Sequence, residues 1–369
     1  MSKEKVQISP TQLTFLIITM VISTADIFIP SFVAQDAKQD SWISPILATL
    51  AMMPVVYMYI RLYKQHQGMS LIEICTDTLG KIAGSIMGIL FAFYFIFIAI
   101  GAVMSLTVVL NITFLPLTPP WVIVVISILV SIYGAYSDLE VVARINEILL
   151  PAGIGALVFL LVLNINEYDF NFFRPVLAEG FLQPVRGGII ILGYFCEVLI
   201  ILQIFPCVNE QVKINRAAFS GILITGAGIL GGTLIYAVFG PLTEVFIIPS
   251  LELAGFTSIG KYIQNLDVLI LAIWITGIYV KIMIFIYTES YAIKQIFRLK
   301  TYKAVVFPLG FMLGGIAIAN IGDRVTELYF MHYIFPVYSI TMACIIPAFL
   351  FIFSTVRKKI NRRKAKTNG

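Results

Sequence analysis

The chain has 369 residues, of which 59% are hydrophobic and only 12% are charged, and its mean hydropathy is +0.96. Soluble domains carry about 25% charged residues, so this composition excludes a soluble fold and indicates a chain that crosses a membrane many times. The formal net charge of +5 says little by itself, because the side chains that carry it are unevenly distributed along the chain.

Apolar stretches long enough to cross a bilayer, at roughly 20 residues each, predict an all-α protein with ten membrane spans. The first stretch is long and no small-residue cleavage pattern follows it, so we expect a span there rather than a cleavable signal. Between Lys81 and Asp138 lie 56 residues without one charge or histidine, and this run holds two spans. The spans are expected at residues 11–35, 43–62, 82–113, 121–137, 141–164, 187–208, 217–239, 264–290, 304–321 and 332–354.

Lysine and arginine are divided unequally between the two sides of this arrangement. If the N-terminus is cytoplasmic, 19 of the 25 lie on the cytoplasmic side, five lie outside, and Lys281 lies within the membrane. Cytoplasmic loops of membrane proteins carry the excess of these residues, so both termini are predicted to be cytoplasmic. The basic tail, residues 355–369, is expected to stop translocation and to contact anionic lipid rather than nucleic acid.

A short pattern in the connector after span two recurs 180 residues later in the connector after span seven. Its two copies are Ser70-Leu71 with Gly80-Lys81 and Ser250-Leu251 with Gly260-Lys261. The two connectors fall on opposite sides, which predicts an inverted five-plus-five repeat over about 11–164 and 187–354. In transporters built this way the first helix of each repeat is broken and binds substrate near the midplane. We therefore expect breaks in spans one and six.

Three charged residues lie well inside otherwise apolar stretches of the spans: Asp26 in span one, Glu197 in span six and Lys281 in span eight. Each costs roughly 2.5–3.5 kcal/mol at the middle of the membrane, so each must be used or paired. Asp26 is expected to bind a ligand amine or a cation, or to cap the second half of a broken helix. Glu197 suits a ligand ammonium or Lys281, or carries a proton. A structural salt bridge from Lys281 to either acid is a further alternative.

The functional site is therefore expected near the midplane, between spans one, three, six and eight. Lys281 shares a helical face with Trp274, Gly277 and Thr288. Tyr94 and Phe97 of span three are candidate gates, although lipid contact or core packing is their simpler role. No nucleotide loop, nucleophile elbow or Cys/His metal spacing is present, which argues against an enzyme and against a cofactor or metal. The candidate ligand-binding residues are Ser23, Thr24, Asp26, Gly193, Tyr194, Glu197 and Thr288.

Short motifs along nearly the whole chain resemble those of a known family. They are Ile8-Ser9-Pro10-x-Gln12, AKQDSWIS at 37–44, Thr118-Pro119, Glu140-x-x-x-Arg144-x-x-Glu147, Pro175-Val176 and Gly193-x-x-x-Glu197. By these motifs the chain resembles the spore germination B-subunit family, within the amino acid–polyamine–organocation superfamily. Ser41 stands where that family would have alanine.

The resemblance implies a ten-span, leucine-transporter-like fold in the inner membrane of a bacterial endospore. It also implies a nutrient germinant receptor subunit that acts with A and C partner subunits, and an amino acid is the expected nutrient. Sodium-coupled members of this fold place an ion between spans one and eight, so the ammonium of Lys281 is expected to take the place of that ion. The alternatives are an amino-acid permease that transports its substrate and a scaffold subunit whose cavity is vestigial.

Overall fold

The computed structural model of the protein describes residues 6–259, 263–264, 267–322 and 324–367. Its α-helices are α1 (Pro10–Ala37), α2 (Ile43–Gln65), α3 (Leu71–Leu79), α4 (Lys81–Thr113), α5 (Pro120–Tyr136), α6 (Leu139–Leu163), α7 (Leu182–Phe195), α8 (Ile201–Ile204), α9 (Ile214–Thr233), α10 (Tyr236–Phe239), α11 (Pro249–Phe256), α12 (Asp267–Phe297), α13 (Lys303–Ala319), α14 (Arg324–Tyr329), α15 (Phe335–Ile340) and α16 (Ile346–Thr367). Short 3-10 turns cover Lys38–Asp40, Ile165–Glu167, Phe170–Phe173, Cys196–Ile200, Phe205–Cys207, Gln211–Lys213 and Gly240–Glu244. Two short strands, β1 (Ser258–Ile259) and β2 (Ile263–Gln264), pair antiparallel.

Eight stretches of these helices are long and apolar enough to cross a membrane. The expected spans four and nine correspond to shorter apolar helices, α5 and α13, so the predicted count of ten is not confirmed. The other expected spans each overlap one helix or a consecutive set of helices. The predicted C-terminal ends of spans eight and ten fall well short of the helix ends. The sequence predicts an end for span eight at residue 290, whereas α12 continues to Phe297, and an end for span ten at residue 354, whereas α16 continues to Thr367.

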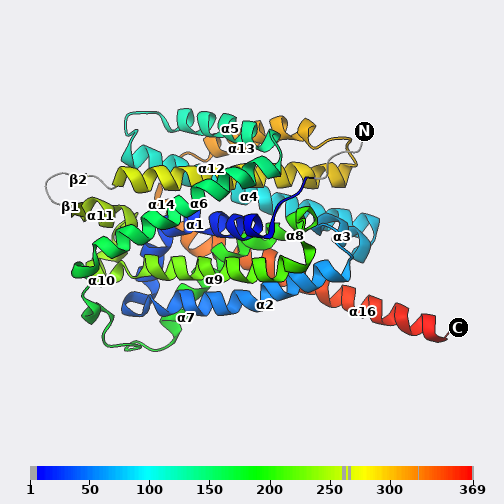
Figure 1. The fold of residues 1–369 in the computed structure, drawn as a ribbon, viewed down its shortest axis with the longest axis horizontal. Coiled ribbons are helices and arrows are strands. Elements are labelled where there is room, and N and C mark those ends of the chain that lie inside the picture. Colours follow the sequence, from blue (N-terminus) through cyan, green and yellow to red (C-terminus); the bar gives the residue numbers. More distant parts are fainter. Residues whose placement is uncertain (1–5, 260–262, 265–266, 323, 368–369) are drawn as a thin grey trace.

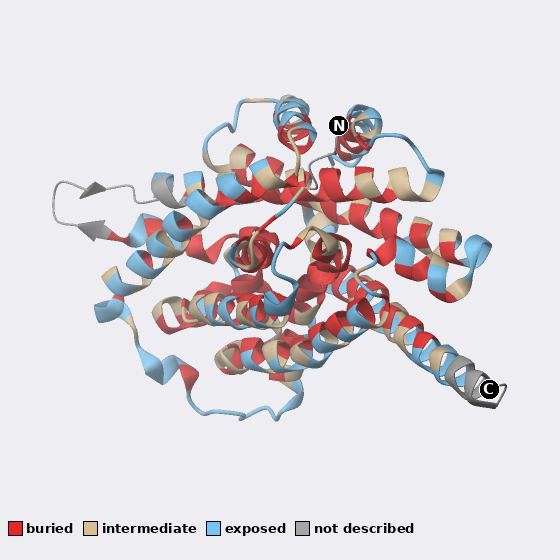
Figure 2. Ribbon diagram, turned by 45° about the vertical axis from the view of Figure 1, so that its right-hand side comes forward, coloured by how far each residue is buried: buried red, intermediate tan, exposed pale blue. Residues whose placement is uncertain are grey.

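Helix α1 runs through the middle of the bundle, with other helices on every side (Figure 1). It packs against α6, α7, α9 and α12, and nearly all of its residues are buried. Figure 2 shows the buried residues concentrated in this central part of the bundle. A helix that is apolar around its whole circumference is expected in the core of a large or membrane-embedded protein.

The prediction that span one is a broken helix is wrong, because α1 is a single α-helix that contains Pro30. Proline has no N–H, so the carbonyl of Asp26, four residues earlier, loses its helical partner. The hydroxyl of Ser250, in α11, donates to that carbonyl at 2.9 Å. A side chain of a neighbouring helix thus satisfies the freed carbonyl, which is one way that membrane helices tolerate proline.

Span six is interrupted, as the sequence predicts, by a change of helical type. Helix α7 ends at Phe195, a 3-10 turn follows over Cys196–Ile200, and α8 begins at Ile201. Glu197 lies in this turn and is buried. A stretch of 3-10 helix in the middle of a span often marks a functional hinge.

The two connectors of the predicted repeat lie at opposite ends of the bundle, with α3 at one end and α11 at the other (Figure 1). Ser70 caps α3 and Gly80 ends it. Ser250 lies in the first turn of α11, whereas Gly260 and Lys261 fall outside the described residues. The inverted repeat itself stays a prediction.

The last span contains two π-helical turns. Phe330–Ile334 lies between α14 and α15, and Thr341–Ile345 lies between α15 and α16. Helix α16 then projects from the bundle at the same end as α3 (Figure 1). The last span therefore begins with two short helices and ends in the longer helix α16, which continues beyond the bundle.

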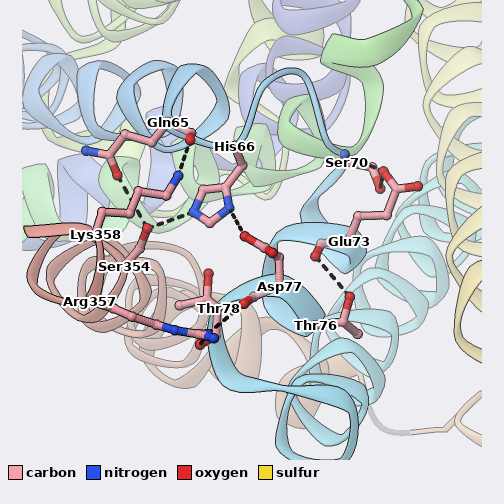
Figure 3. A network of polar contacts seen from close by, with 10 residues as sticks. All are labelled: Gln65, His66, Ser70, Glu73, Thr76, Asp77, Thr78, Ser354, Arg357 and Lys358. Carbon is pink, nitrogen blue, oxygen red and sulfur yellow. Dashed lines mark hydrogen bonds and ion pairs between the residues drawn. The ribbon is translucent and has the colours of Figure 1, made fainter. Parts of the chain in front are cut away.

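Polar contacts tie α16 to the connector between α2 and α3 (Figure 3). The ring nitrogens of His66 lie 2.9 Å from Asp77 Oδ2 and 2.7 Å from Ser354 Oγ. Arg357 donates to two carbonyls in the last turn of α3, at 2.8 and 2.6 Å. Lys358 donates to the last carbonyl of α2. We call these contacts the His66 network, and they hold the end of the last span against the connector.

Candidate functional site

The side chain of Lys281, in α12, lies inside the bundle and is only 1% exposed. Its Nζ donates to Oε2 of Glu197 at 2.6 Å and to Oγ1 of Thr24 at 2.6 Å. Of the two acids that the sequence offered as partners, Glu197 is the one that pairs with Lys281. One ammonium group thus joins α1, the 3-10 turn of span six and α12.

Lys281 reaches these partners because α12 approaches α1 closely. A methyl group in place of the Gly277 hydrogen would lie 3.2 Å from Cβ of Ser23 in α1. Small residues at the interface between membrane helices allow such close approach of the backbones. The predicted face of α12 therefore does meet α1, through Trp274, Gly277 and Lys281.

A cavity of about 430 Å³ lies beside the ion pair. Its volume falls in the range of small-molecule sites, which combine mainly apolar walls with a few polar groups. Thr24, Glu197 and Lys281 supply polar groups on one side, and Phe97 and Tyr194 are among the apolar and aromatic residues of the walls. Helices α1, α4 and α12, span six and the last span all contribute to it.

Aromatic rings form part of the wall. Phe97 of α4, one of the two candidate gates, lines the cavity, and its ring centroid lies 5.0 Å from that of Tyr338 and 6.1 Å from that of Phe335. Tyr194 of α7 also lines the cavity, and its hydroxyl has no hydrogen-bond partner among the described residues. Tyr94, the other candidate gate, is fully buried and packs against Tyr338.

Asp26 is buried on the opposite side of α1. Its Oδ2 accepts a hydrogen bond from Nε1 of Trp274 at 3.2 Å, while its carbonyl accepts the one from Ser250. Thr24 and Asp26 are two residues apart in a helix, so their side chains point about 200° apart around its axis. The structure therefore separates Asp26 from Lys281 and from the cavity beside it.

Three other predicted site residues are buried in the bundle and do not line this cavity. Ser23 packs against Gly277. Gly193 packs against Pro336 of the last span so closely that a side chain would collide with it. The hydroxyl of Thr288 has no hydrogen-bond partner in the described part of the chain.

Two acidic residues of the bundle were not among the predicted site residues. Glu327, in α14, lines the cavity beside Lys281. Glu289, in α12, is 0% exposed, and neither of its carboxylate oxygens has a hydrogen-bond partner among the described residues. The sequence placed Glu289 at the end of span eight, where a charge needs no explanation. The continuation of the helical pattern toward Phe297 was the signal that it lies inside a helix.

The sequence of this chain is similar to those of spore germination proteins. A family model described as spore germination protein matches residues 7–321. Spore germination protein YfkT of Bacillus subtilis is 30% identical over 285 residues, which are 76% of this chain and 78% of that protein. Spore germination protein KB of the same organism is 26% identical over 383 residues, covering 99% of this chain and 98% of that protein.

Solved structures share the fold at low sequence identity. MhsT in complex with L-phenylalanine matches with a TM-score of 0.68 at 11% identity, over 92% of this chain and 89% of that one. A Na⁺-coupled sialic acid symporter in a substrate-bound outward-open state matches with a TM-score of 0.66 at 13% identity, over 92% and 78%. The predicted leucine-transporter-like fold class is therefore confirmed.

Proposed function

Because this chain belongs to the spore germination protein family, we propose that it is the B subunit of a nutrient germinant receptor in the inner membrane of the spore, with both termini cytoplasmic. It binds a small nutrient in the cavity beside Lys281 and passes the signal to A and C subunits. The relatives and fold neighbours named above are germination proteins and transporters rather than enzymes.

The buried ion pair in the wall of the cavity carries this proposal. Lysine has three N–H donors, and Lys281 uses two of them for Glu197 and Thr24. Glu197 uses Oε2 for this bond, which leaves Oε1 for a ligand. A zwitterionic amino acid has the complementary groups, because its carboxylate can accept from Lys281 and its ammonium can donate to Glu197. Its side chain would then lie against Phe97 and Tyr194.

The same cavity offers a route for the signal. A ligand shifts a conformational equilibrium only by its differential affinity for the two states. The walls belong to α4, to span six and to the last span, so a ligand that fits one packing of these helices favours that packing. The last span continues into α16, which projects from the bundle (Figure 1). We therefore place the response to the nutrient in the last span.

Binding of amino acids and sugars to the purified chain in lipid nanodiscs tests the proposal. Glu197→Gln is expected to weaken amino-acid binding ten- to hundredfold, because a hydrogen bond to a charged group contributes about 1.5–3 kcal/mol. The matched control is Glu140→Gln, which removes a partly exposed carboxylate paired with Arg144 at 2.5 Å and should leave binding unchanged. Equal affinities for the parent and both variants would remove Glu197 from the site.

Transport by the same cavity is decided by a separate measurement. An amino acid that binds the purified chain is labelled and added to proteoliposomes that contain the chain, and its uptake is measured. A receptor subunit shows binding without saturable uptake. Uptake that saturates with concentration and is lost in Glu197→Gln would establish the permease instead.

A further inference from the structure

Helix α1 borders a second cavity, on the side that faces away from Lys281. It measures about 210 Å³ and lies between α1, α6, α9 and α11. Among the described residues that line it, the polar ones are Asp26 and Ser250, and the rest are aliphatic residues and glycines such as Leu157, Ile224 and Gly232. The cavity therefore combines one acidic group with apolar walls.

One oxygen of the Asp26 carboxylate accepts a hydrogen bond, and the other has no donor among the described residues. Oδ2 accepts the hydrogen bond from Trp274, whereas no donor in the described part of the chain bonds to Oδ1. The whole residue is only 6% exposed. A methyl group on Gly232 would lie 2.9 Å from Oδ1, so this glycine of α9 keeps open the space beside the unused oxygen.

Within the described residues, no ammonium group is bonded to this carboxylate. Lys281, the intramembrane lysine, donates to Glu197 and Thr24 on the other side of α1. An acidic side chain at membrane depth is costly unless it is paired or hydrated, and such residues usually mark functional sites. A cationic group of a ligand would provide the partner through a charge-assisted hydrogen bond.

The residues that line the cavity beside Asp26 favour an organic ammonium over a metal ion. A metal ion needs several oxygen ligands, and here the polar lining of the described residues consists of Asp26 and Ser250 alone. Aliphatic walls suit a hydrocarbon chain. Val158 and Ile224, which also line the cavity, are 53% and 42% exposed on the outside of the bundle, so the cavity borders the bilayer.

We propose that this cavity binds a small primary amine with an aliphatic chain, which enters from the bilayer. The ammonium donates to Oδ1 of Asp26, and the chain lies along the aliphatic residues of α6 and α9, including Leu157 and Ile224. This site is separate from the nutrient cavity and does not depend on the function proposed above.

Photolabelling of the full chain in proteoliposomes tests this site. The probe is a hexylamine that carries a diazirine on its chain, and the labelled peptides are identified by mass spectrometry. We expect labels on peptides from 154–161 of α6 and 224–232 of α9, and competition by unlabelled hexylamine. Asp26→Asn should lower this labelling about tenfold or more, which corresponds to about 1.4 kcal/mol or more.

Two further variants show whether a loss of labelling comes from the lost charge, from the filled space or from a folding defect. Gly232→Ala fills the space beside Oδ1 and keeps the carboxylate, so it should also reduce labelling, and it decides the question alone if Asp26→Asn does not assemble. Asp36→Asn, the matched substitution elsewhere in α1, should label like the parent. Labelling that is equal with a hexanol diazirine, or that survives both Asp26→Asn and Gly232→Ala, would overturn the proposal.

Discussion

The ammonium of Lys281 and the carboxylate of Glu197 lie 2.6 Å apart, and both side chains are almost completely buried, at 1% and 3% exposed. Burial removes water from both charges, so each depends on the other for its stabilisation. This pair also lines the proposed nutrient cavity. Its loss should therefore affect folding as well as binding.

Lys281→Met is expected to lower the free energy of unfolding by about 3–5 kcal/mol, because it leaves the buried Glu197 carboxylate without its partner. The double variant Lys281→Met with Glu197→Leu should be more stable than the single variant, since it leaves no stranded charge. Thermal unfolding of the purified proteins in the same detergent measures both effects. If the loss of unfolding free energy in the double variant equalled the sum of the losses in the two single variants, the two residues would not act as a pair.

Binding of the nutrient should not depend on sodium. The Lys281 ammonium donates to Thr24 in α1 and so supplies a fixed positive charge between spans one and eight. The measurement is nutrient affinity of the purified chain in sodium, potassium and choline chloride at equal ionic strength, and we expect equal values. A strict requirement for sodium would contradict the idea that the ammonium takes the place of an ion.

Removal of the Ser250 hydroxyl should destabilise the protein much more when Pro30 is present than when it is replaced. Ser250→Ala leaves the buried Asp26 carbonyl without a donor, at a cost of about 1–3 kcal/mol. In a Pro30→Ala background the carbonyl regains a helical N–H partner, so Ser250→Ala should cost much less there. A double-mutant cycle by thermal unfolding measures this coupling. No coupling would mean that the continuity of α1 does not depend on α11.

The His66 network should weaken in acid. Burial and the Lys358 ammonium lower the pKa of His66 below its ordinary value of 6.5, although Asp77 acts in the opposite direction. The ring therefore binds protons more weakly in the closed network than when it is exposed. The stability it contributes is full above pH 6.5 and is lost as pH falls below that value toward the lowered pKa.

Hydrogen exchange of the amides in α16, measured from pH 7.5 to about pH 5 and corrected for the intrinsic rate, should show decreasing protection. His66→Gln keeps hydrogen-bonding groups without the titration, so its protection should change little with pH. An equally steep pH dependence in that variant would assign the effect to another group.

The predicted orientation can be tested with two matched substitutions. Val176, between α6 and α7, and Val212, between α8 and α9, are 51% and 92% exposed. Val176→Cys should react with a membrane-impermeant thiol reagent added outside, and Val212→Cys only after the membrane is opened. The parent, whose four cysteines are unpaired, gives the background. The reverse pattern would contradict cytoplasmic termini.

Sequence patterns predicted the class of this fold well, because hydropathy and the sparse charges depend only on local composition. They also identified Lys281 and Glu197, since a charge in an apolar run is visible without a structure. They could not decide which acid Lys281 pairs with, because that depends on how α1 is rotated. The side chains of Thr24 and Asp26 point about 200° apart around the axis of α1. Packing of α1 against α9 and α12 decides which of the two faces Lys281.

The wrong prediction for span one has a similar physical origin. Its weak-helix residues and Pro30 predict a break when α1 is considered alone. The group that prevents the break is Ser250, which is 224 residues away from Asp26 in the chain. Glu289 was overlooked for a related reason, because the end of span eight was set by hydropathy while α12 continues to Phe297.

The two π-helical turns place extra residues in the last span. Each such turn holds one residue more than an α-helical turn, so a turn that becomes α-helical rotates all that follows by about 100° and shifts it by about 1.5 Å. The first turn, Phe330–Ile334, contributes Phe330 and Met331 to the nutrient cavity. A ligand that displaces Phe330 would thus act on the register of the whole segment beyond it. That change in register would move Ser354 and Arg357 and so strain their contacts in the His66 network.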